Sequence, residues 1–483
     1  MLAAVPFAVT LVVTLIGIGE RQLWRDEHAT WWAASLSFAD LRRFAETVDF
    51  VLVPYYVLLH GWTAVFGDSA VALRLPSALC MAGAAALTAL VGRRLFDATA
   101  GLFAGLLLAA VPAVTRYGQE ARPYAMAVLA SVAAILLLLR ALERPSALRW
   151  LCYGLAVAWV AASHLVALMA LAAHLVAVAA AARADRERRR RILVGWAAAA
   201  GSAVLVSAPL VLVGRGQGGQ ISWVPDPTWE RVQQFPAELF MSPAAAGFFL
   251  VFGLAALAGL AFKDRVGAAM LAVWVLLPPV LAYYTFHEFS FFYPRYLLFT
   301  IPAWVLAAAY ALRRLTAEAG ARGAGAAVLA ATLAGLSFAS WDQQVLIRGD
   351  GILTEFGFRS AAAFIRVHQQ PGDAVVFTGY QYAYRGFRYE WRDLPPDRRP
   401  REALIDASRA PSWSWRQRAC QDPAACLAGT TRIWVVSTDP RGLPLDELLP
   451  PEQGTVIEAR YDKIGETSFP RLRVTELRIK SAP

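Results

Sequence analysis

The sequence predicts a polytopic α-helical membrane protein that carries a small α/β domain at its C-terminal end. Hydrophobic residues make up 58% of the chain and charged residues only 17%, whereas charged residues are about 25% of an ordinary soluble protein. The apolar residues also come in blocks, such as 106–111 and 125–139, and the longest blocks approach the ~20 residues that cross the ~30 Å hydrocarbon core of a bilayer. From Trp341 onward the composition becomes that of a soluble protein.

The formal net charge of +10 does not indicate a nucleic-acid partner, because arginine and lysine lie in short clusters between the apolar blocks. This is the distribution by which loop charge orients membrane spans. The sequence contains no glycine-rich phosphate loop, zinc-ligand spacing or dinucleotide fingerprint. No pair among its 6 histidines has a metal spacing. We therefore expect neither a cofactor nor a protein-bound metal.

The basic clusters give the expected orientation of the spans. If segment 51–66 lies along the membrane surface and the N-terminus is cytoplasmic, every basic cluster from Arg93 to Arg314 faces the cytoplasm, as the positive-inside bias requires. If 51–66 crossed, all these clusters would face outward. The sequence then predicts about eleven spans in the cytoplasmic membrane, at residues 1–18, 74–92, 101–115, 123–139, 150–163, 165–182, 192–213, 246–262, 266–284, 297–312 and 324–341.

This topology divides the chain into a transmembrane domain at 1–341 and an extracytoplasmic α/β domain at 342–483. The outer loop 19–73 carries helices that lie along the membrane surface. Three more polar segments share the outer side, at residues 116–123, 214–245 and 287–296. Tryptophan and proline in the second of these suit a lid at the membrane interface.

The C-terminal domain is expected to alternate helix and strand. Its pattern predicts a helix at 356–368 and strands at 374–378, 432–438 and 471–479. The local spacing of Cys420 and Cys426 suits a disulfide if this domain faces an oxidising compartment. Cys80 and Cys152 lie in apolar blocks, where packed thiols are expected.

The run Leu23–Glu27, directly after the first span, is the strongest local signal of chemistry. Adjacent carboxylates at a membrane surface cost solvation energy unless they are paired or used. One interpretation is that Asp26 caps a helix over 27–35, with Glu27 favoured at the positive end of its dipole. A catalytic role for Asp26 is compatible with the capping interpretation, since an aspartate that caps a helix is held in a fixed position from which it can act as a base.

Three other groups lie on the same predicted side. Two arginines and a glutamate occupy the loop 116–124, for which a solvated turn is the structural alternative. In 291–296, Arg295 lies among aromatic residues that are also ordinary at a membrane interface, and a guanidinium can bind a phosphate with two parallel hydrogen bonds. Arg74 lies at the outer mouth of its span, which departs from the positive-inside pattern.

An ordered set of motifs resembles the GT-C glycosyltransferases, and among them the superfamily of protein O-mannosyltransferases and aminoarabinose transferases, which depend on polyprenyl-phosphate sugars. The motifs are Trp24–Glu27, Pro54–Tyr55, Leu58–Trp62, Phe66–Asp68, Ala72–Leu79, Glu120–Tyr124 and Pro294–Leu297. The resemblance covers roughly residues 10–380. Before Pro54 this chain lacks the His and second Pro of many bacterial members, which bears on the role of Asp49 and on the acceptor geometry.

The resemblance implies a glycosyltransferase that works on the extracytoplasmic side, and we expect the transfer to need no metal. It would move a sugar from a polyprenyl-phosphate donor to a hydroxyl of a cell-envelope acceptor, which could be lipid, glycan or protein. The resemblance implies Asp26 as catalytic base, with Glu27 orienting the acceptor or the Asp26 helix, and arginines that hold the donor phosphate. The residues predicted to bind substrate are Tyr55, His60, Arg74, Glu120, Arg122, Tyr124, Arg295 and Tyr296.

Two other classes of function are open from the sequence. A transporter of lipids or lipid-linked sugars would share the many spans, basic grooves and outer polar loops. Transporters usually carry charges or broken helices near the membrane midplane, whereas the ionisable residues here concentrate at the predicted outer face. The third class is a noncatalytic scaffold for wall assembly that docks through the C-terminal domain. No residue type identifies the sugar.

Overall fold

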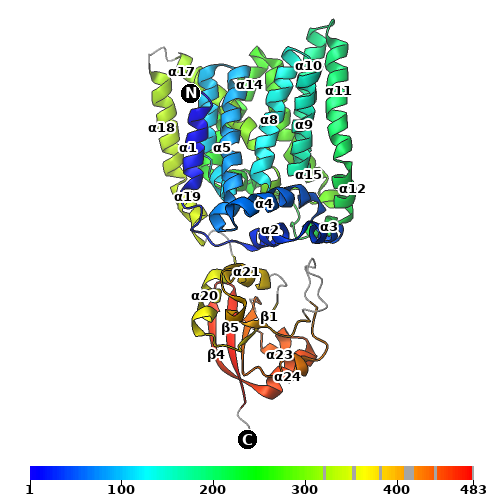
Figure 1. The fold of residues 1–483 in the computed structure, drawn as a ribbon. Helices are drawn as coiled ribbons and strands as arrows, with labels where there is room; N and C mark the ends of the chain where they lie inside the picture. The colour runs from blue at the N-terminus through cyan, green and yellow to red at the C-terminus, as the bar shows by residue number, and fades with distance from the viewer. Residues whose placement is uncertain (319–322, 351–354, 380–382, 407–417, 440–442, 481–483) are drawn as a thin grey trace. The chain divides into compact units, whose positions relative to one another are not determined.

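The computed structural model divides the chain into two compact units. The first comprises Met1–Ile18 and Ala45–Arg348, and the second Gly19–Phe44 and Gly349–Pro483. The structure describes residues 1–318, 323–350, 355–379, 383–406, 418–439 and 443–480. The first unit is a bundle of long helices and the second a sheet flanked by helices (Figure 1). The predicted polytopic helical protein with a C-terminal α/β domain is confirmed.

The helices of the first unit follow the apolar blocks of the sequence. Its α-helices are α1 (Ala4–Leu15), α4 (Val53–Phe66), α5 (Ala70–Leu95), α6 (Ala98–Ala109), α7 (Pro112–Gly118), α8 (Tyr124–Glu143), α9 (Ala147–Ser163), α10 (Leu171–Ala184), α11 (Arg189–Val206), α12 (Ala208–Gly216), α13 (Trp229–Phe240), α14 (Pro243–Lys263), α15 (Arg265–Tyr284), α16 (Phe286–Phe289), α17 (Ile301–Glu318), α18 (Ala324–Ala339) and α19 (Trp341–Arg348). Its 3-10 helices are η1 (Phe50–Leu52), η2 (Leu165–Ala170), η3 (Gly218–Ile221), η4 (Pro294–Tyr296) and η5 (Leu298–Thr300).

The apolar helices make this chain a multi-pass membrane protein. Among the described residues, 7 helices are long and apolar enough to cross a membrane, or up to 9 if each of two bent pairs is one span. These pairs are α6 with α7, bent by 63°, and α18 with α19, bent by 58°. The predicted spans 1–18 and 150–163 correspond to α1 and α9, which are apolar but only 12 and 17 residues long. The number of about eleven spans therefore stays a prediction.

Segment 51–66 lies across one end of the bundle as α4, instead of alongside the long helices (Figure 1). Pro54 occupies its first turn, where a missing N–H leaves no hydrogen bond unmade. The helix ends at Gly67, whose φ of 77° suits a residue without a Cβ. We call this end of the bundle the α4 end. Helix α5 begins at the α4 end and runs away from it, and α6 runs back toward it. Helix α8 therefore also begins at the α4 end.

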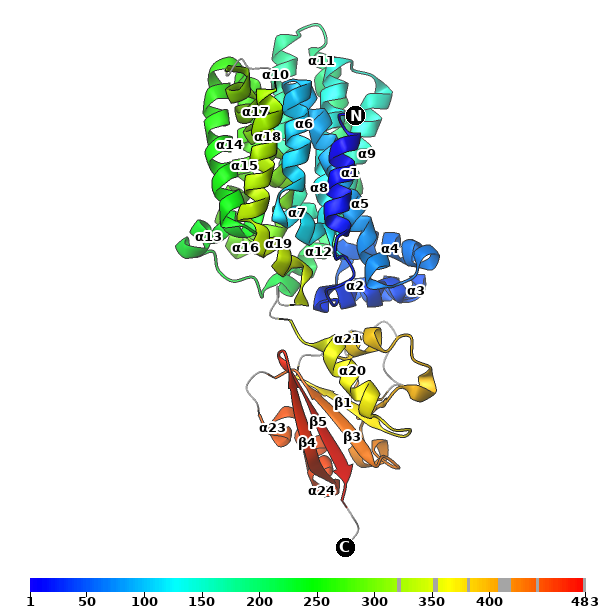
Figure 2. The same cartoon turned by 90° about the vertical axis from the view of Figure 1, so that its left-hand side faces the viewer.

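Small residues let the long helices approach one another closely. A Cβ on Gly92 of α5 would lie 2.8 Å from the Cα of Gly101 on α6, and one on Gly101 would lie 2.4 Å from the carbonyl oxygen of Ala89. Close backbone approach matters in a bilayer because lipid provides no hydrophobic drive for helix association. Helices α14, α15, α17 and α18 lie side by side on another face of the bundle (Figure 2).

The second unit is built on a five-stranded sheet of order β2-β1-β3-β5-β4. Strand β1 runs parallel to β2 and β3, and β5 runs antiparallel to β3 and β4. The strands are β1 (Ala374–Thr378), β2 (Arg401–Glu402), β3 (Arg432–Ser437), β4 (Tyr461–Phe469) and β5 (Leu472–Ile479). The helices are α2 (Arg25–Ser35), α3 (Phe38–Thr47, of which the part up to Phe44 belongs to this unit), α20 (Phe358–His368), α21 (Ala383–Glu390), α22 (Pro423–Cys426), α23 (Leu445–Leu448) and α24 (Pro451–Arg460).

The predicted helix and strands of the C-terminal domain are present with small shifts of their ends, whereas β2 and β4 were not predicted. Successive side chains of β3 point to opposite faces of the sheet, so the sheet has a hydrophobic core on each face. Trp434 and Val436 pack with Phe358 of α20 and Phe387 of α21. On the other face, a second cluster joins β3 to α24 and contains Ile433, Val435 and Ile457.

The segment Gly19–Phe44 is fastened to the C-terminal part of the chain by the side chain of Gln22. Its amide nitrogen donates to the Phe356 carbonyl at 3.0 Å, and its amide oxygen accepts from the Arg359 N–H at 3.1 Å. The backbone N–H of Gln22 donates to Asp350 at 2.7 Å. Asp26 therefore belongs to the second unit, although it follows the first apolar helix in the sequence.

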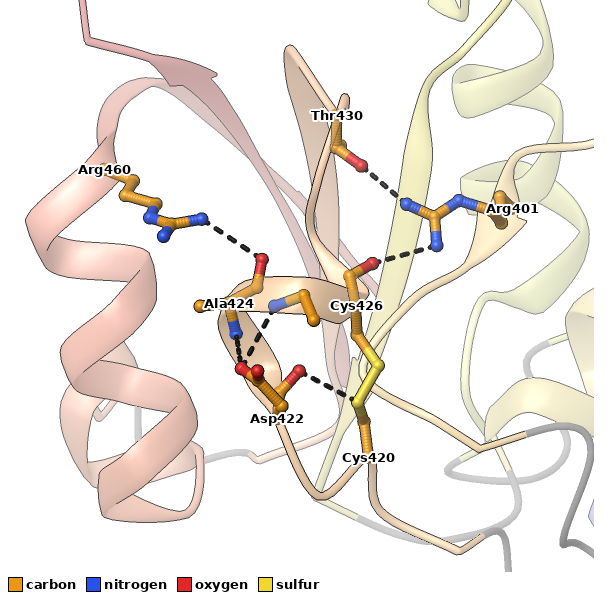
Figure 3. Close-up of a disulfide and its surroundings, with 8 residues drawn as sticks. Arg401, Cys420, Asp422, Ala424, Cys426, Thr430 and Arg460 are labelled. Atoms are coloured by element: carbon orange, nitrogen blue, oxygen red, sulfur yellow. Dashed lines mark hydrogen bonds between the residues drawn. A yellow bond between two sulfur atoms is a disulfide. The ribbon is translucent and has the colours of Figure 1, made fainter.

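A disulfide joins Cys420 and Cys426, as their spacing suggested (Figure 3). Arg401 holds the same loop by donating to the Cys426 carbonyl at 2.9 Å and to the Thr430 hydroxyl at 2.6 Å. Asp422 caps the short helix α22 between the two cysteines. The loop is thus tied both covalently and by hydrogen bonds.

The buried carboxylate of Asp373 gives the first testable prediction. It accepts hydrogen bonds from Arg432 Nη2 at 2.7 Å and from Trp434 Nε1 at 2.9 Å, and it is 4% exposed. Asp373→Ala leaves a buried guanidinium without its main partner, which costs about 3–5 kcal/mol of the second unit's stability. Proteolysis of the full-length protein in increasing urea measures this loss.

Asp393→Ala is the matched control, because the Asp393 side chain is 84% exposed and its ion pair with Arg392 spans 3.6 Å. It should change the stability by less than about 1 kcal/mol. Equal urea resistance of the two variants would contradict the structural role of Asp373.

Candidate active site

The guanidinium of Arg295 is enclosed by aromatic rings at the α4 end of the bundle. Its Cζ lies 5.0 Å from the ring centroid of Trp223, 5.1 Å from Tyr293, 5.6 Å from Tyr296 and 5.7 Å from Tyr124. The residue is only 9% exposed. Ring faces attract a cation electrostatically, so this enclosure stabilises the buried charge. The planar fork of donors on a guanidinium also matches a phosphate group.

A tight turn places Arg295 among these rings. Pro294 opens η4, where its fixed φ favours the turn, and the N–H of Tyr296 bonds the Tyr293 carbonyl at 3.0 Å. The preceding loop is held by Phe292, whose ring lies 4.8 Å from that of Phe235 on α13. The Arg295 side chain is therefore presented by a rigid support.

A buried ion pair continues the site along α7. Arg116 bonds the carboxylate of Glu120, and their side chains are only 4% and 0% exposed. The Arg116 Cζ lies 5.5 Å from the ring of Tyr117, and that ring lies 5.6 Å from the ring of Tyr124. Glu120 thus connects to the Arg295 cluster through Arg116 and Tyr117.

His164 adds a polar group that the sequence analysis did not select. It lies at the junction of α9 and η2, with its ring 5.2 Å from that of Tyr296 and 5.8 Å from that of Tyr124. Within the described part of the chain, its buried Nδ1 has no hydrogen-bond partner. The charges of Arg122 and Arg295 both act on this ring. Imidazole, guanidinium and phenol groups therefore gather at one place.

Arg122 also reaches α4. The Tyr56 hydroxyl donates to the Asp49 carboxylate at 2.8 Å and is hydrogen-bonded to the Arg122 side chain. Burial, together with the Asp49 carboxylate, raises the pKa of Tyr56, so the phenol stays protonated and can donate. The carbonyl of Arg122 accepts a hydrogen bond from Ser77 on α5 at 3.3 Å.

Three of the predicted substrate-binding residues lie on α4 and α5. Arg74 is fully buried, and its Nη1 donates to the carbonyl of Ile18 at 2.8 Å. Tyr55 is buried in α4, and His60 is partly buried later on the same helix. The Arg74 bond fixes the end of the chain that leaves α1.

In the second unit, Glu27 rather than Asp26 caps α2. The helix has Trp24 as its N-cap residue, and the backbone N–H of Trp24 donates to the Glu27 carboxylate at 3.3 Å. The interpretation of Asp26 as the cap is therefore wrong. Glu27 is fully buried, whereas the Asp26 side chain is 24% exposed and lies 3.8 Å from the Nε of Arg25.

The turn that carries Asp26 is held in place by aromatic contacts. The ring of His28 lies 5.2 Å from that of Phe358 on α20 and 5.5 Å from that of Tyr389 on α21. The ring of Trp31 lies 5.2 Å from the same Tyr389. Helix α2 is thus packed on one side, with Asp26 at its first turn.

The structure brings part of the predicted site together. In the first unit, Tyr124, Arg295 and Tyr296 share one cluster, which extends to Glu120 through Arg116 and to Arg122 through His164. The described residues contain no group of three or more His, Cys, Asp or Glu side chains placed to hold a metal ion. Asp26 and Glu27 belong to the second unit.

A polytopic helical bundle with an arginine site at one end and a C-terminal α/β domain is the architecture of a GT-C glycosyltransferase, and comparison with solved structures confirms this fold. The fold matches that of ArnT from Cupriavidus metallidurans in the apo state with a TM-score of 0.63 and 15% identity, over 98% of this chain and 97% of that one. ArnT bound to undecaprenyl phosphate matches with a TM-score of 0.58 and 14% identity, over 98% and 97% of the chains.

A more distant match is the oligosaccharyltransferase of Archaeoglobus fulgidus, in complex with Zn and sulfate. Its TM-score is 0.52 at 12% identity, over 90% of this chain and 68% of that one. Residues 52–212 match the family model of the dolichyl-phosphate-mannose-protein mannosyltransferases. No curated protein matches the chain. The predicted resemblance is thus confirmed in its fold.

The Arg116–Glu120 pair gives a prediction that separates structure from function. Glu120→Gln leaves the buried Arg116 charge without its counter-ion and should lower stability by about 3–5 kcal/mol. The double variant Arg116→Met/Glu120→Leu removes both charges and should restore most of the loss. Thermal unfolding in detergent measures both variants.

The same pair of variants tests whether Glu120 binds substrate. If Glu120 serves only Arg116, the stable double variant should keep its catalytic rate once that rate can be assayed. A stable but inactive double variant would assign Glu120 to the substrate, as the sequence predicts. A stable Glu120→Gln single variant would contradict the buried ion pair.

Proposed function

We propose that this chain is a membrane glycosyltransferase that moves a sugar from a polyprenyl-phosphate donor to a hydroxyl of a cell-envelope acceptor. The observation that carries the proposal is the Arg295 guanidinium, fixed among four aromatic rings at one end of an apolar bundle. The fold shared with ArnT, a protein that has been crystallised with undecaprenyl phosphate, supports the class of donor. The match to the mannosyltransferase family model supports sugar transfer.

Arg295 is assigned to the donor phosphate. When the bond between the anomeric carbon and the phosphate oxygen breaks, the leaving polyprenyl phosphate gains one negative charge. A guanidinium already held in place stabilises this developing charge more than the ground state. Arg122, whose charge acts on the same His164 ring, is assigned to the same phosphate. Tyr124 and Tyr296 orient Arg295, and Glu120 is assigned to the sugar hydroxyls.

Asp26 is assigned as the general base. It takes the proton of the acceptor hydroxyl while the hydroxyl oxygen attacks the anomeric carbon, and the sugar is transferred with inversion. The partial exposure of Asp26 suits contact with an acceptor, whereas Glu27 is buried and caps the helix that carries Asp26. We therefore assign Glu27 to positioning. Arg74 holds the chain after α1, and Tyr55 and His60 are assigned to the acceptor side.

The α4 end is assigned to the extracytoplasmic side of the cytoplasmic membrane. At the opposite end of the bundle, the last turns of α5, α8 and α10 carry basic residues, which include Arg93, Arg94, Arg140 and Arg183. Such clusters favour the cytoplasmic side of a membrane. The Cys420–Cys426 disulfide supports an oxidising compartment for the second unit. The proposed reaction thus takes place outside the cytoplasm.

Asp26→Asn tests the base. The variant keeps the size of the side chain but cannot accept the proton, so turnover should fall by about 10²- to 10⁴-fold. Release of free polyprenyl phosphate from a panel of labelled polyprenyl-phosphate sugars measures turnover, with cell-envelope extract as acceptor. Asp40→Asn in α3 is the control, because it removes a carboxylate from the same segment and should retain wild-type turnover.

The same assay separates the proposed enzyme from a transporter or a scaffold, since neither of those releases polyprenyl phosphate. Wild-type turnover by Asp26→Asn would refute the assignment of the base. A wild-type protein that releases nothing from any donor of the panel, although it binds them, would refute the transferase.

Arg295→Lys tests the phosphate assignment. Lysine keeps the positive charge but loses the planar fork and the contact with the rings. Affinity for undecaprenyl phosphate should fall about tenfold for Arg295→Lys and further for Arg295→Gln, as expected when a charge-assisted hydrogen bond is lost. Equilibrium binding in nanodiscs measures the affinity. Arg265→Lys, at an exposed position that starts α15, is the control and should bind as the wild type does.

A further inference from the structure

A second site with basic side chains lies at the end of the bundle opposite the α4 end. A pocket of about 350 Å³ opens there, lined by Arg94, Leu137, Arg140, Leu148, Arg149 and Cys152. These residues come from the last turns of α5 and α8 and the first turns of α9. The proposed reaction uses none of them.

The polar half of the pocket has an excess of positive charge. Arg94 pairs with Glu143, the one carboxylate that the described residues bring into these contacts. Arg149 donates to the carbonyl oxygens of Arg140 at 2.7 Å and Arg144 at 3.3 Å, which end α8. In the part of the chain that the structure describes, the exposed side chain of Arg140 forms neither a hydrogen bond nor an ion pair. Three guanidinium groups against one carboxylate favour an anion.

The apolar half of the pocket continues along the surface of α9. Leu148, Leu151 and Leu155 are 68%, 57% and 62% exposed. Positions separated by three and four residues share one face of a helix, so these leucines form a stripe that starts at the pocket and runs toward the middle of the bundle. A soluble anion would make no contact with this apolar stripe, whereas an acyl chain would pack against it.

We propose that the pocket binds an anionic phospholipid of the leaflet at this end of the bundle. Its phosphate lies against Arg94, Arg140 and Arg149, and one acyl chain lies along the leucine stripe. Guanidinium groups bind phosphate oxygens through charge-assisted hydrogen bonds, and basic pockets between transmembrane helices bind anionic headgroups. The lipid would link the ends of α5, α8 and α9. This inference does not depend on the proposed transferase activity.

Cys152 provides a direct readout, because it lines the pocket and its thiol is free. Cys80→Ser removes the other free thiol, and Cys420 and Cys426 are already joined. The protein is placed in nanodiscs of phosphatidylcholine, with or without phosphatidylglycerol, and the rate of labelling by an uncharged maleimide is measured. Phosphatidylglycerol should slow the labelling of Cys152 by about fivefold or more.

Arg140→Gln is the test variant, because among the described residues this side chain has no hydrogen-bond partner whose loss would disturb folding. It should abolish most of the protection. Arg190→Gln is the matched control, since Arg190 is exposed in the first turn of α11 and lies outside the pocket. Protection should survive in this control.

Two outcomes would overturn the proposal. Labelling that phosphatidylglycerol does not slow, or slows equally in Arg140→Gln, shows that no specific lipid site exists. Glycerol phosphate added to phosphatidylcholine nanodiscs forms the remaining arm of the experiment. If this soluble anion protects Cys152 as well as the lipid does, the site binds free phosphate groups and the leucine stripe has no part in it.

Discussion

The constraint on which the bundle depends is that a cation among apolar helices must find its partners within the protein. The hydrocarbon core of a bilayer offers no hydrogen-bond acceptor. This chain uses three solutions: a carbonyl oxygen for Arg74, a carboxylate for Arg116 and aromatic rings for Arg295. The carboxylate neutralises its arginine. The ring faces attract the Arg295 cation, so this arginine is stabilised by a contact of a different kind.

A similar division of tasks occurs between the two carboxylates of α2. Glu27 caps the helix, because its carboxylate accepts a hydrogen bond from the N–H of Trp24. Asp26, one residue earlier, is part of the first turn without capping it and is partly exposed. Helix packing through His28 and Trp31 holds that turn. Adjacent acidic residues thus differ in burial because a helix turn points them in different directions.

The sequence predicts those features that depend on neighbouring residues. Apolar blocks gave the long helices, and β-branched or aromatic runs gave β1, β3 and β5. Strand β4 was missed because most of its residues are exposed or partly buried, as at a sheet edge, so it lacks a continuous apolar run. The attachment of Gly19–Phe44 was missed because the Gln22 and Asp350 bond joins positions 328 residues apart.

The candidate site follows the same rule. Tyr124, Arg295 and Tyr296 lie in short motifs and could be predicted. Trp223 and His164 could not, because they come from a loop and a helix junction that only the packing of the bundle brings to Arg295 and Tyr296. A polar residue near a predicted helix end, such as His164, was the sole available signal. It is too common to distinguish a site residue from a packed one.

The length of α8 keeps the two basic sites apart. Tyr124 begins this helix beside Arg295, and Glu143 ends it beside Arg94. At 1.5 Å per residue, 20 residues span about 30 Å, the thickness of a bilayer core. A single headgroup cannot reach both. The surroundings also differ, since Arg295 is enclosed by rings whereas Arg140 opens onto a leucine stripe. The rings limit access to the Arg295 guanidinium, while the stripe leaves the Arg140 pocket open along one side, so the two basic places differ in shape as well as in position.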